Sequence, residues 1–141
     1  MADSLATLIK LMKTHVDEQR QLLAKVQAHL AQIEYEITEL EIRQATEQLT
    51  VQQNPDMALT YGDFVRWAIE RARELETQRQ TAAAAVELAR DKLSQLFEEQ
   101  KRYELAAVAR DAEERREELK RENDELNEIG SVNFMRNKGD V

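Results

Sequence analysis

The 141-residue chain has a net charge of −8, and 34% of its residues are charged but only 5% are aromatic. This charge argues against partners with phosphate backbones, so we expect no nucleic acid, and against an anionic membrane surface. The absence of cysteine excludes disulfides, thiolate metal sites and cysteine nucleophiles. The composition is typical of coiled coils, and no segment is apolar enough to span a bilayer. We therefore expect a cytoplasmic protein without direct membrane insertion.

A first helix is predicted over residues 3–53, because apolar residues alternate there in steps of four and three. Only Gln19 interrupts the apolar series. Further along, Ile42, Ala45 and Leu49 predict that the stripe continues in a shifted phase. The members of the unshifted stripe are Leu5, Ile9, Met12, Val16, Gln19, Leu23, Val26, Leu30, Ile33, Ile37 and Leu40.

Residues 54–60 are predicted to form a loop. Pro55 removes a backbone donor and pushes the preceding residue out of helical geometry. The hydroxyl of Thr60 could cap a second helix, and Asp63 suits the positive end of its dipole. A short loop between long helices makes them antiparallel. With the loop centred near residue 57, the expected seam contacts are Leu40 with Leu75, Leu30 with Val86 or Ala85, and Leu23 with Leu93.

A second helix is predicted over residues 61–129. Gly130 is a favourable residue for ending it, and we expect a disordered tail over 131–141. The chain should therefore be all-α, with residues 1–130 forming an antiparallel coiled-coil hairpin whose second helix is longer than the first. The second seam consists of Tyr61, Val65, Ala68, Ala72, Leu75, Arg79, Ala82, Val86, Ala89, Leu93, Leu96, Gln100, Tyr103 and Ala107.

The sequence offers no pattern for catalysis. His15 and His29 lie two heptads apart, and no Glu-x-x-His pair is present to build a di-metal site. Phosphate-binding loops, nucleophile elbows and zinc spacings are also absent from the sequence. We therefore expect no enzyme activity, no metal and no cofactor.

Two surfaces are candidates for protein binding. Phe64 is predicted on the flank of the seam and Trp67 on the outside, where large aromatic side chains often anchor interfaces. Phe64 could alternatively fold over the loop and staple the end of the hairpin. The second candidate is the charged overhang of the second helix, with Leu119, Leu126 and Ile129. Its alternative interpretation is a solvated helix extension that binds nothing.

Two short motifs accompany this layout. A Tyr-x-x-Phe element, Tyr61-Gly62-Asp63-Phe64, opens the second helix, and Asp124-Glu125-Leu126 lies near its end. With two long helices and a short break, the chain resembles FliJ, a coiled-coil component of the flagellar type III export apparatus, over nearly its whole length.

This resemblance implies a stalk-like protein at the export apparatus, peripheral to the inner membrane. It implies binding to the hexameric export ATPase, to the cytoplasmic domain of the export gate and to export chaperones. Carried over by position, the gate-binding residues are Phe64, Trp67, Ala68, Arg71 and Leu75. Arg71 departs from the apolar or small residue often found there in the family. The ATPase-binding residues are Leu5, Ile9, Val108, Ala112, Leu119 and Leu126.

Three other interpretations compete with this one. The stalk protein of a virulence injectisome has the same architecture. A prefoldin-like or adaptor chaperone also holds clients at the ends of a helical hairpin, but it predicts a β-strand near the loop. A structural coiled coil that dimerises in parallel could explain the polar seam residues Gln19, Arg79 and Gln100.

Overall fold

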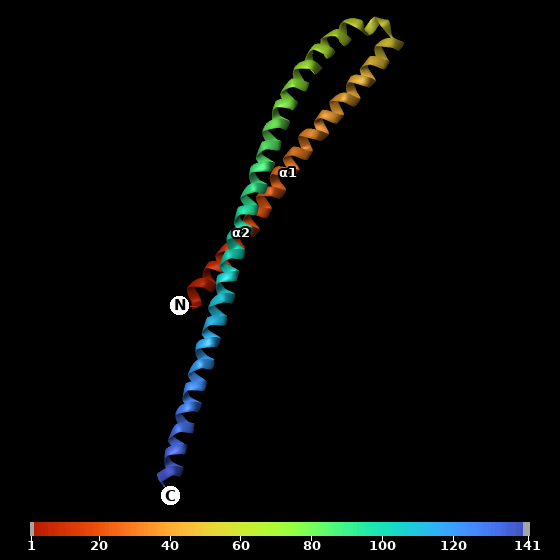
Figure 1. Cartoon of the computed structure of the whole chain (residues 1–141). Helices are drawn as coiled ribbons and strands as arrows, with labels where there is room; N and C mark the ends of the chain where they lie inside the picture. Colours follow the sequence, from red (N-terminus) through yellow and green to blue (C-terminus); the bar gives the residue numbers. More distant parts are fainter. Residues whose placement is uncertain (1, 140–141) are drawn as a thin grey trace. The chain divides into compact units, whose positions relative to one another are not determined.

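The computed structural model describes residues 2–139, and these residues form two long helices (Figure 1). Helix α1 spans Ala2–Gln53, the 3₁₀ helix η1 spans Pro55–Met57 and helix α2 spans Ala58–Gly139. The lengths of α1 and α2 are 52 and 82 residues. No strand occurs within this described part. The predicted all-α hairpin with a longer second helix is confirmed.

Contacts divide the chain into two compact units. One is Thr14–Phe97, here called the hairpin unit, in which α1 and α2 pack against each other on either side of the turn. The other, here called the terminal unit, combines the described parts of Met1–Lys13 and Glu98–Val141. Each unit contains one of the two candidate binding surfaces, so they are described separately below.

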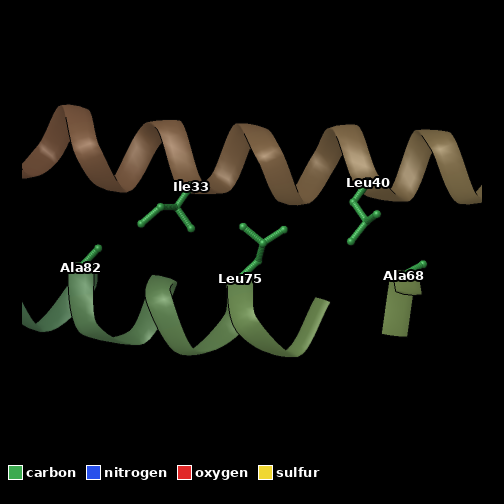
Figure 2. Close-up of a cluster of buried hydrophobic side chains, with 5 residues drawn as sticks. All are labelled: Ile33, Leu40, Ala68, Leu75 and Ala82. Atoms are coloured by element: carbon green, nitrogen blue, oxygen red, sulfur yellow. The ribbon is translucent and has the colours of Figure 1, made fainter. Parts of the chain in front are cut away.

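The core of the hairpin unit is a single seam. Its central cluster joins Ile33 and Leu40 of α1 to Ala68, Leu75 and Ala82 of α2, with the side chains pointing toward the facing helix (Figure 2). Ile33 and Leu40 of α1 meet two alanines and one leucine of α2. The alanines let the two backbones approach, and Leu75 fills the space between them. Every buried residue of this unit was a predicted seam position, and the full set is Val16, Ile33, Leu40, Ala68, Leu75, Ala82, Val86 and Ala89.

The predicted shift in the phase of the α1 stripe is wrong. Ile42 and Leu49 are 56% and 60% exposed, whereas Gln44, Glu47 and Val51 are half-buried. A shift of two positions turns a helical stripe by nearly half a turn, because each residue advances the helix by about 100°. Continuing in register therefore keeps α1 facing α2, and the seam simply accepts polar residues near the turn.

The prediction that Ala72 belongs to the seam of α2 is also wrong. Ala72 is exposed, and Arg71 takes the half-buried position beside it. The guanidinium of Arg71 pairs with Glu36 of α1 at 3.4 Å and with Glu74 at 3.1 Å. The long aliphatic stem of an arginine can cover apolar surface while its charged end reaches these carboxylates.

The turn is tighter than predicted. The amide of Asn54 donates to the carbonyl of Thr50 at 2.9 Å, and that of Met57 donates to the carbonyl of Asn54 at 3.0 Å. Asn54 leaves helical geometry, with φ −130° and ψ 86°, and α2 begins at Ala58, so Thr60 lies inside the helix and cannot cap it.

The turn thus centres on Asn54 rather than on residue 57, and the register moves with it. Gln19 meets Ala89, where the expected register would have placed it near Leu96. Leu40 and Leu75 still share the central cluster, as predicted.

The predicted end of the second helix at residue 129 is wrong as well. Gly130 has no positive φ, and α2 continues through it to Gly139. A glycine ends a helix when it adopts the left-handed conformation, and here it remains helical. The last two residues of the predicted tail lie outside the described residues.

Candidate partner-binding surfaces

The gate-side candidate in the hairpin unit is built on an aromatic pair. Phe64 and Trp67 are three residues apart on α2, so they share one side of the helix, and their ring centroids are 5.9 Å apart. Arg43 of α1 places its guanidinium carbon 5.1 Å from the centre of the Phe64 ring and 5.2 Å from that of Trp67. Both distances are within the range of cation–π attraction. The arginine therefore links the two helices through the faces of both rings.

A shallow groove runs beside this pair between the two helices. Apolar and aromatic groups form part of its wall, and charged side chains of both signs surround them. This mixture suits a partner segment that places an apolar anchor against the aromatic face and polar groups at the rim. The groove is lined by Glu36, Glu39, Leu40, Ile42, Arg43, Thr46, Trp67, Arg71 and Leu75.

The five predicted gate-side residues have different environments. Trp67 is 46% exposed, and Arg71 and Phe64 are half-buried. Ala68 and Leu75 belong to the core, with exposures of 0% and 1%, although Leu75 also reaches the wall of the groove. The two core residues can position their neighbours, while Trp67 offers the largest accessible apolar area.

Sequence reasoning missed the contribution of α1 to this surface. Arg43 and Ile42 line the groove, and Arg43 makes both aromatic contacts. A turn centred on Asn54 would have placed residue 43 opposite Phe64. The proline at residue 55 was the signal for that centre, since a helix commonly ends just before the residue preceding a proline.

The terminal unit brings together only some of the predicted ATPase-side residues. Leu5 and Ile9 of α1 are half-buried and line a hollow with Ala107 and Arg110 of α2. The other predicted members lie on α2 with their side chains in solvent. These are Ala112, which is exposed, and Val108, Leu119 and Leu126, which are 65%, 62% and 65% exposed.

Several charged side chains pair with a neighbour three residues away on the same helix. Arg79 donates two hydrogen bonds to Glu76, at 2.9 and 2.6 Å, and these bonds lower the pKa of the Glu76 carboxyl. His15 lies 4.0 Å from Glu18, one turn away. Among the described residues, no group of three or more potential metal ligands comes together, and no helix is long and apolar enough to cross a membrane.

Comparisons with known proteins complete the description. No curated protein and no solved structure gave a significant match to the chain. A family model described as "Flagellar FliJ protein" matches residues 1–139. The match favours the flagellar interpretation over the injectisome. The prefoldin-like alternative loses its structural basis, because the described residues around the turn form no strand. The chain belongs to the FliJ family of coiled-coil proteins of flagellar type III export.

Proposed function

We propose that this protein is a non-enzymatic, stalk-like coiled coil that binds both the export ATPase ring and the cytoplasmic domain of the export gate. In this role it couples energy to the export of flagellar proteins from the cytoplasmic side of the inner membrane. It also associates with export chaperones. Membership of the FliJ family supports the setting, and the two distinct surfaces support two separate partners.

The gate is assigned to the aromatic surface of the hairpin unit. The observation that carries this assignment is Trp67, which leaves 46% of its surface exposed while Arg43 and Phe64 hold its ring in place. A pre-positioned tryptophan loses little conformational freedom on binding, and interfaces often concentrate their binding energy on such residues.

The ATPase is assigned to the terminal unit. Leu119 and Leu126 are well exposed for leucines, and charged residues of both signs surround them. The Arg116–Glu113 pair, at 3.6 Å, is one of these solvated contacts. Exposed ion pairs contribute little individually, so a partner can exchange them readily. Such a surface suits a contact that must be remade during ATPase turnover.

The test measures the two partners separately. Purified wild type, Trp67→Ala and a Leu119→Ala/Leu126→Ala double variant are titrated with the gate cytoplasmic domain and with the ATPase. We expect Trp67→Ala to weaken gate binding at least tenfold and to leave ATPase binding unchanged. The double variant should show the reverse pattern. The chain alone should hydrolyse no ATP.

Ile69→Ala is the matched control, because Ile69 is also 46% exposed on α2 but lies outside the groove. Its gate affinity should equal that of wild type. Equal losses for Trp67→Ala and Ile69→Ala would contradict the gate assignment. Unchanged ATPase binding by the leucine double variant would contradict the ATPase assignment.

A further inference from the structure

Helix α1 carries a second stripe of uncharged residues that does not belong to the seam. We call it the outer stripe. All of its members are exposed, and the three largest, Tyr35, Ile42 and Leu49, are 59%, 56% and 60% exposed. In a chain in which 34% of residues are charged, the stripe contains no charge. It consists of Ala28, Ala31, Tyr35, Thr38, Ile42, Ala45 and Leu49.

The spacing of the outer stripe is that of a coiled-coil seam. Its members follow one another in steps of three and four, which is the heptad pattern that packs against another helix. From Ala28 to Leu49 it extends for about 30 Å, at about 1.5 Å per residue. An apolar stripe of that length and spacing fits one further helix better than a compact ligand.

The outer stripe lies outside the seam, although one member, Ile42, also lines the groove beside Trp67. Ile33 and Leu40 point from α1 toward α2 (Figure 2). Tyr35 and Ile42 each follow one of these residues by two positions, which places them nearly half a turn round the helix. The stripe is therefore on a different side of α1 from the seam, and α2 leaves its members exposed.

Thr38 behaves as an apolar member of the stripe. Its hydroxyl donates to the carbonyl of Glu34 at 3.1 Å, so its donor is already used within the helix. Thr46 satisfies its own hydroxyl in the same way with the carbonyl of Ile42, at 2.9 Å. A partner could cover these residues without leaving their hydroxyl donors unsatisfied.

The edges of the outer stripe are acidic. In heptad terms, the flanking positions hold three glutamates and no basic residue, and the others are glutamine or threonine. Glu34 also has a favourable charge interaction with Arg79 of α2, which leaves Glu39 and Glu41 as the other two glutamates. Flanking charges determine which helices pair in a coiled coil. The flanking residues are Gln27, Gln32, Glu34, Glu39, Glu41, Thr46 and Gln48.

We propose that the outer stripe binds an α-helix of another protein, which has its own heptad stripe of apolar residues flanked by lysine and arginine. This helix adds a third strand to the coiled coil of the hairpin unit. A second copy of the chain does not fit when outer stripes meet, because glutamates would face glutamates. The proposal does not rest on Phe64 or Trp67, although the stripe shares Ile42 with the gate-side groove.

The experiment uses two labelled synthetic helices of 28 residues, with isoleucine at every a position and leucine at every d position. One carries lysine at its e and g positions and the other carries glutamate. Binding to the full chain is followed by fluorescence anisotropy. We expect the lysine helix to bind at least tenfold more tightly than the glutamate helix.

A pair of matched variants separates the stripe from general charge attraction. Ala31→Glu/Ala45→Glu adds two glutamates on the stripe, and Ala84→Glu/Ala109→Glu adds two at exposed alanines of α2. Both variants have the same charge, so a general attraction for lysine would rise equally in both. We expect the first to lose lysine-helix binding at least tenfold and the second to keep it, with circular dichroism confirming that both remain helical.

Three results would overturn the proposal. These are equal binding of the two synthetic helices, equal affinities of the two double variants, and a wild-type dimer in light scattering that Ala31→Glu/Ala45→Glu dissociates. The last result would mean that a second copy covers the stripe. A Phe64→Ala/Trp67→Ala variant should bind the lysine helix like wild type, so loss of gate binding and loss of stripe binding can be told apart.

Discussion

Gln19 donates a hydrogen bond from its side-chain amide to the backbone carbonyl of Ala89, at 3.1 Å and across 70 residues of sequence. Gln19 is the polar residue within the otherwise apolar first stripe, and Ala89 is 5% exposed. The methyl group of Ala89 is small enough for the amide to reach the helix backbone beside it. One polar seam position can fix the register of a coiled coil at some cost in stability, and this bond gives the hairpin such a marker.

Enlarging Ala89 should disturb this contact. Ala89→Leu would place a larger side chain where Gln19 approaches the backbone, and overpacking of this kind typically costs about 1–3 kcal/mol. Chemical denaturation should show a lower free energy of unfolding for this variant. Ala84→Leu, at an exposed alanine of the same helix, should remain near wild type. An Ala89→Leu variant as stable as wild type would show that the seam has spare room.

Leu75 should be a major single contributor to the central cluster. It is 1% exposed, and truncating a buried leucine to alanine typically costs about 2–5 kcal/mol because a cavity remains. Leu88→Ala is the control, since Leu88 is 72% exposed on the same helix. Thermal unfolding should separate the two variants clearly. Similar melting temperatures would contradict the assignment of Leu75 to the core.

The Glu76–Arg79 pair predicts a small dependence of stability on pH. The hydrogen bonds from Arg79 lower the pKa of Glu76 in the folded chain. Stabilisation is therefore present above the unfolded pKa, which is about 4.3 for glutamate. It is lost as the pH falls through the lower folded value.

Melting temperatures measured from neutral to acid pH should fall slightly less for Glu76→Gln than for wild type. Glu98→Gln provides a charge-matched control at an exposed glutamate of α2. The effect is expected to be small because Glu76 is exposed. A Glu76→Gln profile that is steeper than that of wild type would reverse the predicted sign.

Arg43 should control access to Trp67, which is the single tryptophan of the chain and therefore reports directly in fluorescence. The guanidinium lies 5.2 Å from the centre of the indole ring. We expect Arg43→Gln to increase quenching by acrylamide, because removal of the cation uncovers the ring. Arg66→Gln is the control. Arg66 lies on α2, as Trp67 does, but its exposed guanidinium pairs with Asp63. Identical quenching in both variants would argue against the stacked arrangement.

Gly130 should be a weak point of α2 that alanine can strengthen. It lies within the helix without a positive φ, and an added Cβ would meet nothing within 4 Å. Glycine within a helix costs roughly 0.5–1 kcal/mol relative to alanine. Hydrogen exchange near residue 130 should slow in Gly130→Ala. Faster exchange there would indicate that the glycine ends the helix after all.

The hairpin could be predicted because heptad spacing specifies both the helix type and the side that is buried. The details near the turn could not be predicted by the same rule. Apolar periodicity pointed to Ile42 and Leu49, but the seam used Gln44 and Glu47. Their aliphatic stems can cover the facing helix while their polar ends reach solvent. A pattern based on residue polarity alone does not predict that such polar residues are partly buried in the seam.

The candidate surface was predicted from one helix only. Trp67 stood out as a large outward-facing aromatic residue, and it is exposed as expected. Arg43 did not stand out, because its contact with the rings depends on the register, and the register depends on a turn of a few residues. An error of three positions at the turn was enough to conceal the residue that joins both helices at this site.

The distribution of buried residues gives the hairpin unit a gradient of local stability. From residue 41 to residue 67, on either side of the turn, no side chain is fully buried, whereas Leu40 and Ala68 begin the buried cluster. Segments with few buried apolar contacts open at a lower free energy than the rest of a protein. The helices can therefore separate at the turn end of the hairpin, as far as Leu40, while they remain packed together in the middle of the unit. Arg43 and Trp67 lie within that segment. A partner that binds the aromatic face therefore also shifts the equilibrium between separated and packed helices at the turn end.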